Sequence, residues 1–128
     1  MSKSPGHKEF PDHKVLEKHP KEKFQVKVDR NVIAESSDVI EVDEDENPQR
    51  FYFPRSAVKM NLLNRTETTS KCPFKGTAHY YSLKLGGKTL NDAVWTYEEP
   101  FEEHVDLKDR MAFYDDKIKD IKIEKLAS

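Results

Sequence analysis

Apolar and polar residues alternate in several short stretches of this chain. Phe24, Val26 and Val28 are separated by Gln25 and Lys27, and a period of two residues predicts a strand with one buried face. Comparable stretches bounded by turn residues predict further strands at residues 32–35, 38–42, 51–53, 78–85, 93–97, 111–114 and 120–125, with 66–71 either an edge strand or a loop. Many short strands with regular turn signals favour an antiparallel sandwich or open barrel, and therefore a mainly β fold.

One segment departs from this alternation and predicts a single short helix. Val58, Leu62 and Leu63 fall on one face at helical spacing. The hydroxyl of Ser56 is placed to accept hydrogen bonds from the free amides of the first turn, so we expect Ser56 to cap this helix.

Residues 1–22, the N-terminal tail, are polar and rich in lysine and proline. Only Phe10, Val15 and Leu16 offer apolar side chains for packing. This composition predicts a flexible tail, followed by one domain over residues 23–128. The tail lacks the apolar core of a secretory signal, and no apolar run approaches the roughly 20 residues of a membrane span.

The charge and the cysteine content narrow the functional classes. Charged residues make up 36% of the chain, yet the net charge is only -2. Such a balance argues against a nucleic-acid partner, because a protein that binds nucleic acid usually carries an excess of basic residues on one face. A single cysteine, Cys72, excludes an internal disulfide. We therefore expect a cytoplasmic protein without a membrane or nucleic-acid partner.

The sequence Cys-Pro-Phe-Lys-Gly at residues 72–76 is the first candidate for chemistry. Pro73 and Gly76 favour a tight loop. The ammonium of Lys75 would stabilise a thiolate at Cys72, and His79 is the nearest histidine that could act as a base. Cys72 is therefore a candidate nucleophile or redox thiol. The alternative is a structural role, because free cysteine often behaves as a small buried hydrophobe.

The second candidate is a group of aromatic residues on two predicted strands. Tyr80 lies on one strand, Trp95 and Tyr97 lie on another, and small residues share their faces. Large rings beside small side chains can leave a hollow, and an apolar pocket with polar tips is the usual form of a small-ligand site. The alternative is an ordinary aromatic core with hydroxyl groups at its rim.

Metal and nucleotide sites are not indicated. Three of the five histidines lie in the tail, and no cysteine or histidine pair has the spacing of zinc ligands. Gly86 and Gly87 form a turn signal, not a phosphate-binding loop before a helix. The acidic run at residues 43–46 lacks the spacing of a calcium loop and predicts a solvated loop. We expect no metal and no cofactor.

The chain resembles the family called DUF427 over about residues 24–114. The resemblance rests on five stretches in order: Ile-Ala-Glu-Ser at 33–36 with Glu41, Phe-Tyr-Phe-Pro at 51–54 with Val58 and Leu63, residues 72–78 with Tyr80, Ala-Val-Trp-Thr-Tyr at 93–97 with Pro100, and Met-Ala-Phe-Tyr at 111–114. Two positions depart from the family pattern. Phe74 stands where the family usually has tyrosine, and Ser56 stands where it often has aspartate.

The resemblance implies a β-tent, in which two antiparallel sheets are pinned together at one end. It carries no catalytic role, because the family has no established activity. It adds Glu41 to the candidate site, whose members are then Glu41, Cys72, Lys75, Tyr80, Trp95 and Tyr97. The leading hypothesis is a module that binds an unidentified small molecule between the aromatic residues and a polar Cys, Lys and Glu end. An enzyme that uses Cys72, or an interaction domain whose tail recruits a partner, are the alternatives.

Overall fold

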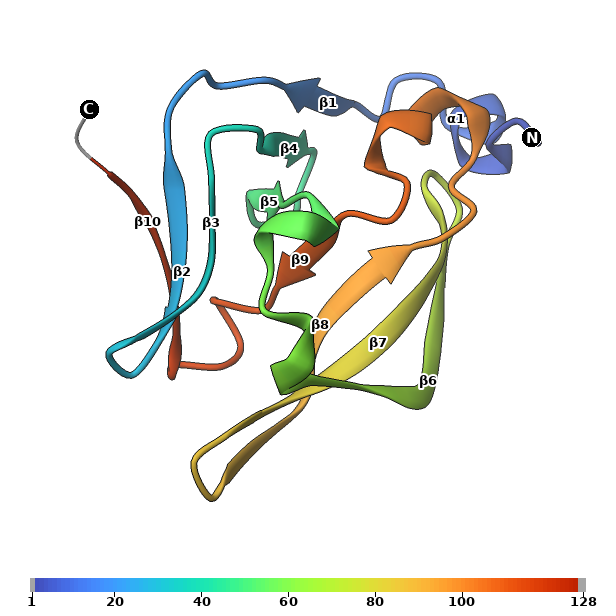
Figure 1. The fold of residues 1–128 in the computed structure, drawn as a ribbon. Coiled ribbons are helices and arrows are strands. Elements are labelled where there is room, and N and C mark those ends of the chain that lie inside the picture. The colour runs from blue at the N-terminus through green and yellow to red at the C-terminus, as the bar shows by residue number, and fades with distance from the viewer. Residues whose placement is uncertain (1, 127–128) are drawn as a thin grey trace.

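The computed structural model describes residues 2–126, in which ten strands form three antiparallel sheets (Figure 1). With η denoting a 3₁₀ turn, the elements in chain order are α1 (Pro5–Glu9), β1 (Val15–Lys18), β2 (Phe24–Val28), β3 (Asn31–Ser36), β4 (Ile40–Glu44), β5 (Arg50–Tyr52), η1 (Arg55–Ala57), η2 (Met60–Leu62), β6 (Leu63–Cys72), β7 (Gly76–Leu85), β8 (Lys88–Tyr97), η3 (Glu102–Leu107), β9 (Met111–Phe113) and β10 (Ile121–Lys125). The predicted mainly β class is confirmed.

The sheets have the orders β1-β4-β5, β10-β2-β3 and β6-β7-β8-β9, so there are three where the resemblance implies two. The additional division falls between β3 and β4, which are consecutive in the chain but pair with different strands. At the bend between them the Asp38 amide donates to Ser36 Oγ, which redirects the chain into the β1-β4-β5 sheet. A bridge between Phe53 and Met111 joins that sheet to β9.

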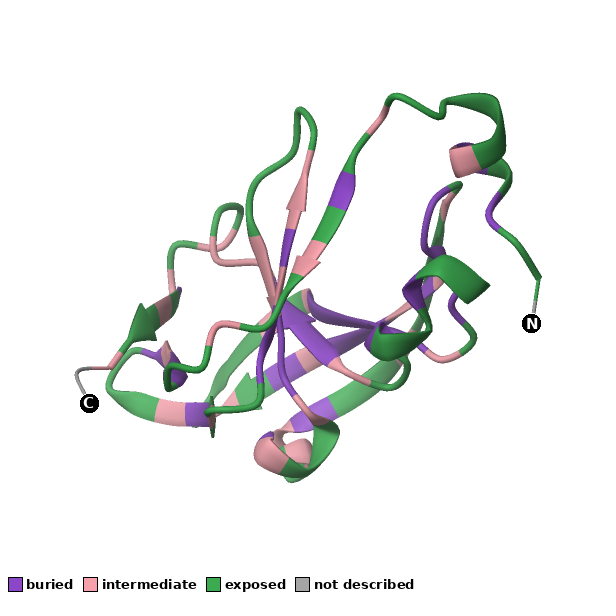
Figure 2. Ribbon diagram, turned by 90° about the horizontal axis from the view of Figure 1, so that it is seen from above, coloured by how far each residue is buried: buried purple, intermediate pink, exposed green. Residues whose placement is uncertain are grey.

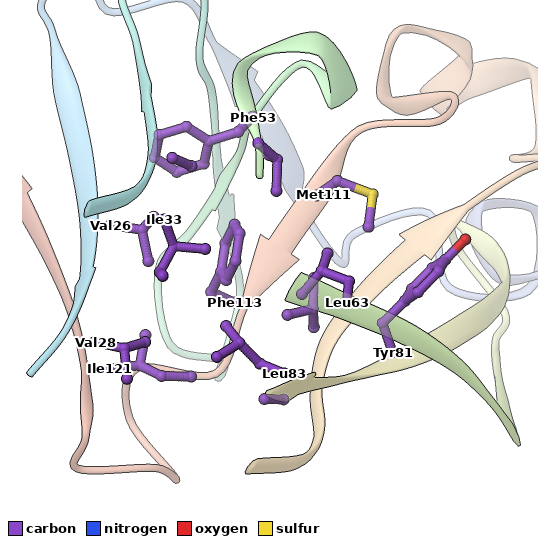
Figure 3. Close-up of a cluster of buried hydrophobic side chains, with 14 of the residues drawn as sticks. Val26, Val28, Ile33, Phe53, Leu63, Tyr81, Leu83, Met111, Phe113 and Ile121 are labelled. Atoms are coloured by element: carbon purple, nitrogen blue, oxygen red, sulfur yellow. The ribbon is translucent and has the colours of Figure 1, made fainter. Parts of the chain in front are cut away.

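The larger hydrophobic core lies where the β10-β2-β3 sheet faces the four-stranded sheet (Figure 3). Val26 and Ile33 come from one side, Leu83 and Phe113 from the other, and all four are essentially inaccessible to solvent. The buried positions gather where the strands cross, and the outer faces are exposed (Figure 2). Along β2, Phe24, Val26 and Val28 enter this core, and Gln25 on the other face is buried as well. β7 contributes to two clusters, with Tyr81 and Leu83 in this core and Ala78 and Tyr80 in the second.

The predicted helix after Pro54 is wrong. Two single 3₁₀ turns, η1 and η2, occupy this segment, and neither has a side-chain cap. Ser56 lies inside η1 and not at its start. Val58 is extended, with ψ 139°, and it bridges to Ala34 of β3. That pairing interrupts the helical path, so the apolar spacing of this segment reflects contacts of a loop with the core.

The described part of the N-terminal tail lies against the domain. Ser4 caps α1, and β1 pairs with β4 along its whole length (Figure 1). The flexibility of the tail stays a prediction, but a division at residue 22 would separate β1 from the sheet that it completes. Among residues 2–126, no helix combines the length and the apolar character needed to cross a bilayer.

Candidate functional site

A pocket of about 170 Å³ opens where the four-stranded sheet meets β4 and β5. Strand alternation builds it, because Tyr80 of β7, Trp95 and Tyr97 of β8, and Tyr52 of β5 all point to the same side of their strands. The full lining consists of Val42, Glu44, Asn47, Pro48, Arg50, Tyr52, Ser70, Lys75, Tyr80, Trp95, Tyr97 and Tyr114. The three aromatic residues expected from the sequence therefore line one pocket.

Ring contacts hold the aromatic wall in place. The centroids of Trp95 and Tyr114 lie 4.2 Å apart, and Tyr80 stacks on Tyr114 at 6.3 Å. The indole Nε1–H of Trp95 donates to the hydroxyl of Tyr52 at 3.2 Å, and this satisfies a buried donor. A wall whose rings are fixed on each other loses little conformational entropy when a flat molecule lies against it.

The pocket holds phenol groups that stay protonated at neutral pH. Burial raises the pKa of Tyr52 and of Tyr97 well above the ordinary value of a tyrosine. Within residues 2–126 the Tyr97 hydroxyl forms no hydrogen bond, and it lies at the pocket wall. Tyr97 therefore offers a free O–H donor to whatever enters.

A cation lies against the same wall. The guanidinium carbon of Arg50 is 5.1 Å from the ring centre of Trp95 and 5.2 Å from that of Tyr114. Arg50 Nη1 also donates a hydrogen bond of 2.7 Å to Asp116 Oδ1, which lies outside the pocket lining. Cation–π contact and ion pairing together orient this guanidinium beside the pocket.

The polar end is a buried lysine with two partners. Lys75 is only 6% exposed, and its Nζ donates to Glu44 Oε1 at 2.5 Å and lies 3.7 Å from Cys72 Sγ. The other oxygen of Glu44 lies 3.0 Å from His13 Nε2. Burial by itself raises the pKa of Glu44, but the hydrogen bonds from Lys75 and His13 outweigh it, so the pKa lies below its ordinary value.

Glu41, expected at the polar end, faces the opposite side of β4. Ile40, Val42 and Glu44 share the face toward the aromatic cluster, so Glu41 lies in a second groove beside Gln49. There, burial and the neighbouring Asp43 raise the pKa of Glu41. Glu44 takes its place in the pocket. The prediction of a solvated loop at the acidic run is therefore wrong for Glu44, which is the last residue of β4. Continuing the alternation of Ile40 and Val42 by two residues would have placed Glu44 on the same face.

Cys72 is the last residue of β6, and it pairs with Gly76 of β7 across the turn. Its side chain is half-buried against the aromatic cluster, beside the lining residue Lys75. His79, the expected base, points to the other face of β7, where Arg65 holds it at 2.9 Å. The structure thus brings Cys72 and Lys75 together and leaves His79 apart from them.

Gly76 is required by the backbone at this turn. Its φ is +125°, and a Cβ here would lie 3.2 Å from the carbonyl oxygen of Glu99. Lys75 lies directly before it, and the Lys75 carbonyl accepts the amide of Phe101. The turn is therefore fastened to the chain after β8, and this fixes the direction of the Lys75 side chain.

Sequence reasoning missed Glu44, Arg50, Tyr52, Ser70 and Tyr114 as lining residues. Arg50 and Tyr52 alternate on β5, but three residues are too few to reveal a period. Tyr114 directly follows β9. These residues come together only through pairing across sheets, which a local pattern does not report.

The fold and the pocket define a class: a small mainly β domain with an aromatic-walled pocket and a buried lysine–carboxylate pair at one end. Among known families, the one described as a domain of unknown function, DUF427, matches residues 16–124. The chain belongs to this family. No curated protein matches it significantly.

Proposed function

We propose that the protein is a small-molecule binding module whose pocket takes one planar ring. The observation that carries this proposal is the aromatic wall of Trp95, Tyr114 and Tyr80 beside a free hydroxyl and two cations. A side-chain core closed on itself would leave no such hollow. Convergent polar groups around an aromatic surface are the usual form of a ligand site.

The size of the pocket limits the ligand. A dry cavity of about 150 Å³ holds a benzene molecule, and the pocket here measures about 170 Å³. One six-membered ring therefore fills it, and any substituent extends toward the opening. The lining contains Arg50 and Lys75 against the single carboxylate of Glu44. Both cations are paired, Lys75 with Glu44 and Arg50 with Asp116 outside the lining. The N–H groups of Arg50, with the Tyr97 donor, favour a ring that carries an anionic or hydrogen-bond-accepting group.

Benzoate is a suitable probe, and Trp95 reports its binding because it is the only tryptophan. A one-ring probe of about nine atoms gains roughly 3 kcal/mol at ordinary ligand efficiency, so the titration extends to tens of millimolar. We expect a saturable change in Trp95 fluorescence with benzoate, and a weaker one with benzylamine or cyclohexanecarboxylate at equal ionic strength.

Arg50→Gln should weaken benzoate binding. Arg110→Gln is the matched control, because its side chain is 16% exposed against 15% for Arg50 and is also paired with an aspartate, outside the pocket. Equal responses to benzoate and benzylamine, or equal effects of the two variants, would contradict the proposal.

The second candidate function is an enzyme that uses Cys72 as a nucleophile or redox thiol. The distance of 3.7 Å between Lys75 Nζ and Cys72 Sγ favours it, because an adjacent ammonium stabilises a thiolate. Iodoacetamide tests it: the thiol gives its proton to solvent, the sulfur–carbon bond forms, and iodide leaves.

We expect fast alkylation of the folded protein at neutral pH, slowed by Lys75→Met. The control Lys71→Met, next to the cysteine but exposed, should not slow it. If the thiol reacts only after unfolding, Cys72 is a packing residue and this second function fails.

A further inference from the structure

Residues 2–14 of the N-terminal tail pack closely against the turn that carries Lys75. The Gly6 amide donates to the Pro73 carbonyl oxygen at 2.8 Å, and the Ser4 hydroxyl donates to the same oxygen at 2.6 Å. A Cβ on Gly6 would lie 2.7 Å from that oxygen, so only glycine permits the approach. Ser4 is 1% exposed. In Figure 1, α1 lies beside the β6–β7 turn and η3, and it contacts both.

The tail also reaches the polar end of the pocket. The ring of Phe74 lies between two tail histidines, edge-on to His7 at 5.0 Å and stacked on His13 at 4.4 Å. His13 in turn contacts Glu44, the partner of Lys75. These contacts join the tail to the turn and to Glu44, which lines the pocket. Residues 2–14 precede residues 16–124, the region that matches the family.

A chain of three titratable groups fastens α1 to the domain. His104 of η3 is 3% exposed; its Nδ1 lies 2.5 Å from Glu17 Oε2, and its Nε2 lies 2.8 Å from His7 Nε2. With Nδ1–H donating to the Glu17 carboxylate, a neutral His104 has a lone pair at Nε2, which accepts from His7 Nε2–H. When both rings are charged, two N–H groups face each other at this distance and repel.

We propose that residues 2–14 form a proton-sensitive clamp on the 72–76 turn, docked while the His7–His104 pair shares one hydrogen between its facing nitrogens and progressively released as the pair takes up further protons. Release withdraws His13 from Glu44 and both histidines from Phe74. The turn that carries Lys75 and Cys72 then keeps its contact with Phe101 but loses its contacts with the tail. The clamp itself does not depend on the proposed ligand function.

The charges around the pair agree with this direction. Burial and then His104 lower the pKa of His7 below its ordinary value of 6.5, and His13 adds to the decrease. Glu103 and Glu44 act in the opposite direction but do not restore the value. His104 also faces Glu17 of β1 and Glu103. The docked state therefore holds fewer protons than the released state at His7. Docking is complete above pH 6.5 and weakens as the pH falls, by at most about tenfold per pH unit for one proton.

Hydrogen exchange of the full chain tests the clamp. Exchange of peptides covering residues 2–14, corrected for the intrinsic pH dependence of amides, is compared between pH 7.5 and pH 5, with β7 and β8 as the internal reference. We expect protection at Gly6 and Phe10, whose amides donate to Pro73 and Gly6, to fall up to about tenfold per pH unit below 6.5. Protection in β7 and β8 should stay constant.

Two variants complete the experiment. His7→Gln keeps a donor for His104 without a titrating group, so the pH dependence of residues 2–14 should disappear. His19→Gln is the matched control, because His19 is an exposed histidine of the same tail, and it should behave as the unmodified chain. Protection of residues 2–14 that is absent at pH 7.5, that does not change with pH, or that changes equally in His7→Gln would overturn the proposal.

Discussion

Replacing Glu44 with glutamine should destabilise the fold by leaving the Lys75 ammonium buried without a countercharge. The two side chains are 13% and 8% exposed, so the value of about 0–1 kcal/mol for surface pairs does not apply. Breaking a buried pair costs about 3–5 kcal/mol. Because glutamine keeps an oxygen that accepts from Lys75, and some solvent reaches the pair, we expect a loss of about 2–3 kcal/mol.

Urea unfolding followed by Trp95 fluorescence measures this loss, since the only tryptophan lies in the same pocket. Lys75→Met combined with Glu44→Gln should cost less than the sum of the two single changes, by about 1–2 kcal/mol. The control is Glu35→Gln, whose exposed pair with Lys23 should contribute under about 0.5 kcal/mol.

The pH dependence of the same pair has a definite sign. The pKa of Glu44 in the folded state lies below its ordinary value of 4.5, so the folded state binds fewer protons there than the unfolded chain. The stabilisation is complete above pH 4.5 and is lost as the pH falls through the lowered pKa. In Glu44→Gln this part of the acid destabilisation should disappear. A loss no larger than that of Glu35→Gln, or additive single changes, would refute the reasoning.

Three further changes follow from the structure, each measured by the free energy of unfolding in urea. Thr96→Val should stabilise the fold by about 1 kcal/mol, because Thr96 Oγ1 is the one buried side-chain N or O atom of the described residues without a hydrogen bond; a loss would indicate a partner. Gly76→Ala should cost at least about 1 kcal/mol, given its positive φ and the nearby carbonyl of Glu99; a neutral result would show that the turn can relax. Leu83→Ala should cost about 2–5 kcal/mol, because the side chain is fully buried in the core of Figure 3, and a cost below 1 kcal/mol would contradict that packing.

Alternation located strands such as those at residues 24–28 and 78–85, since alternating positions reflect local strand geometry. It left the assignment of β6 open. The ten residues of β6 are mostly polar and exposed because the strand lies at the edge of its sheet, and a register shift between Arg65 and Thr69 disturbs its period. Pairing with β7 forms this strand, and a sequence pattern does not contain that information.

The candidate site was predictable to the same extent. Four of the predicted residues line the pocket: Tyr80, Trp95, Tyr97 and Lys75. They could be predicted because each belongs to a strand or turn with a clear local signal. The alternation of Ile40 and Val42 places Glu44, and not Glu41, on their face of β4. That this face meets the aromatic cluster depends on pairing across sheets, which the sequence pattern does not contain. The sequence pattern assigned no role to the tail histidines for the same reason: their partners are distant in sequence, with His7 and His104 97 residues apart.

The most direct test of the binding proposal is the Trp95 indole N–H signal in a nuclear magnetic resonance titration with benzoate. This signal is unique in the chain, and its proton points to Tyr52 at the pocket wall. The account predicts a saturable shift of this signal together with the amides of β8 around Trp95 and Tyr97, weakened by Arg50→Gln and not by Arg110→Gln. A signal that does not move at tens of millimolar benzoate, or shifts confined to the groove beside Glu41, would contradict it.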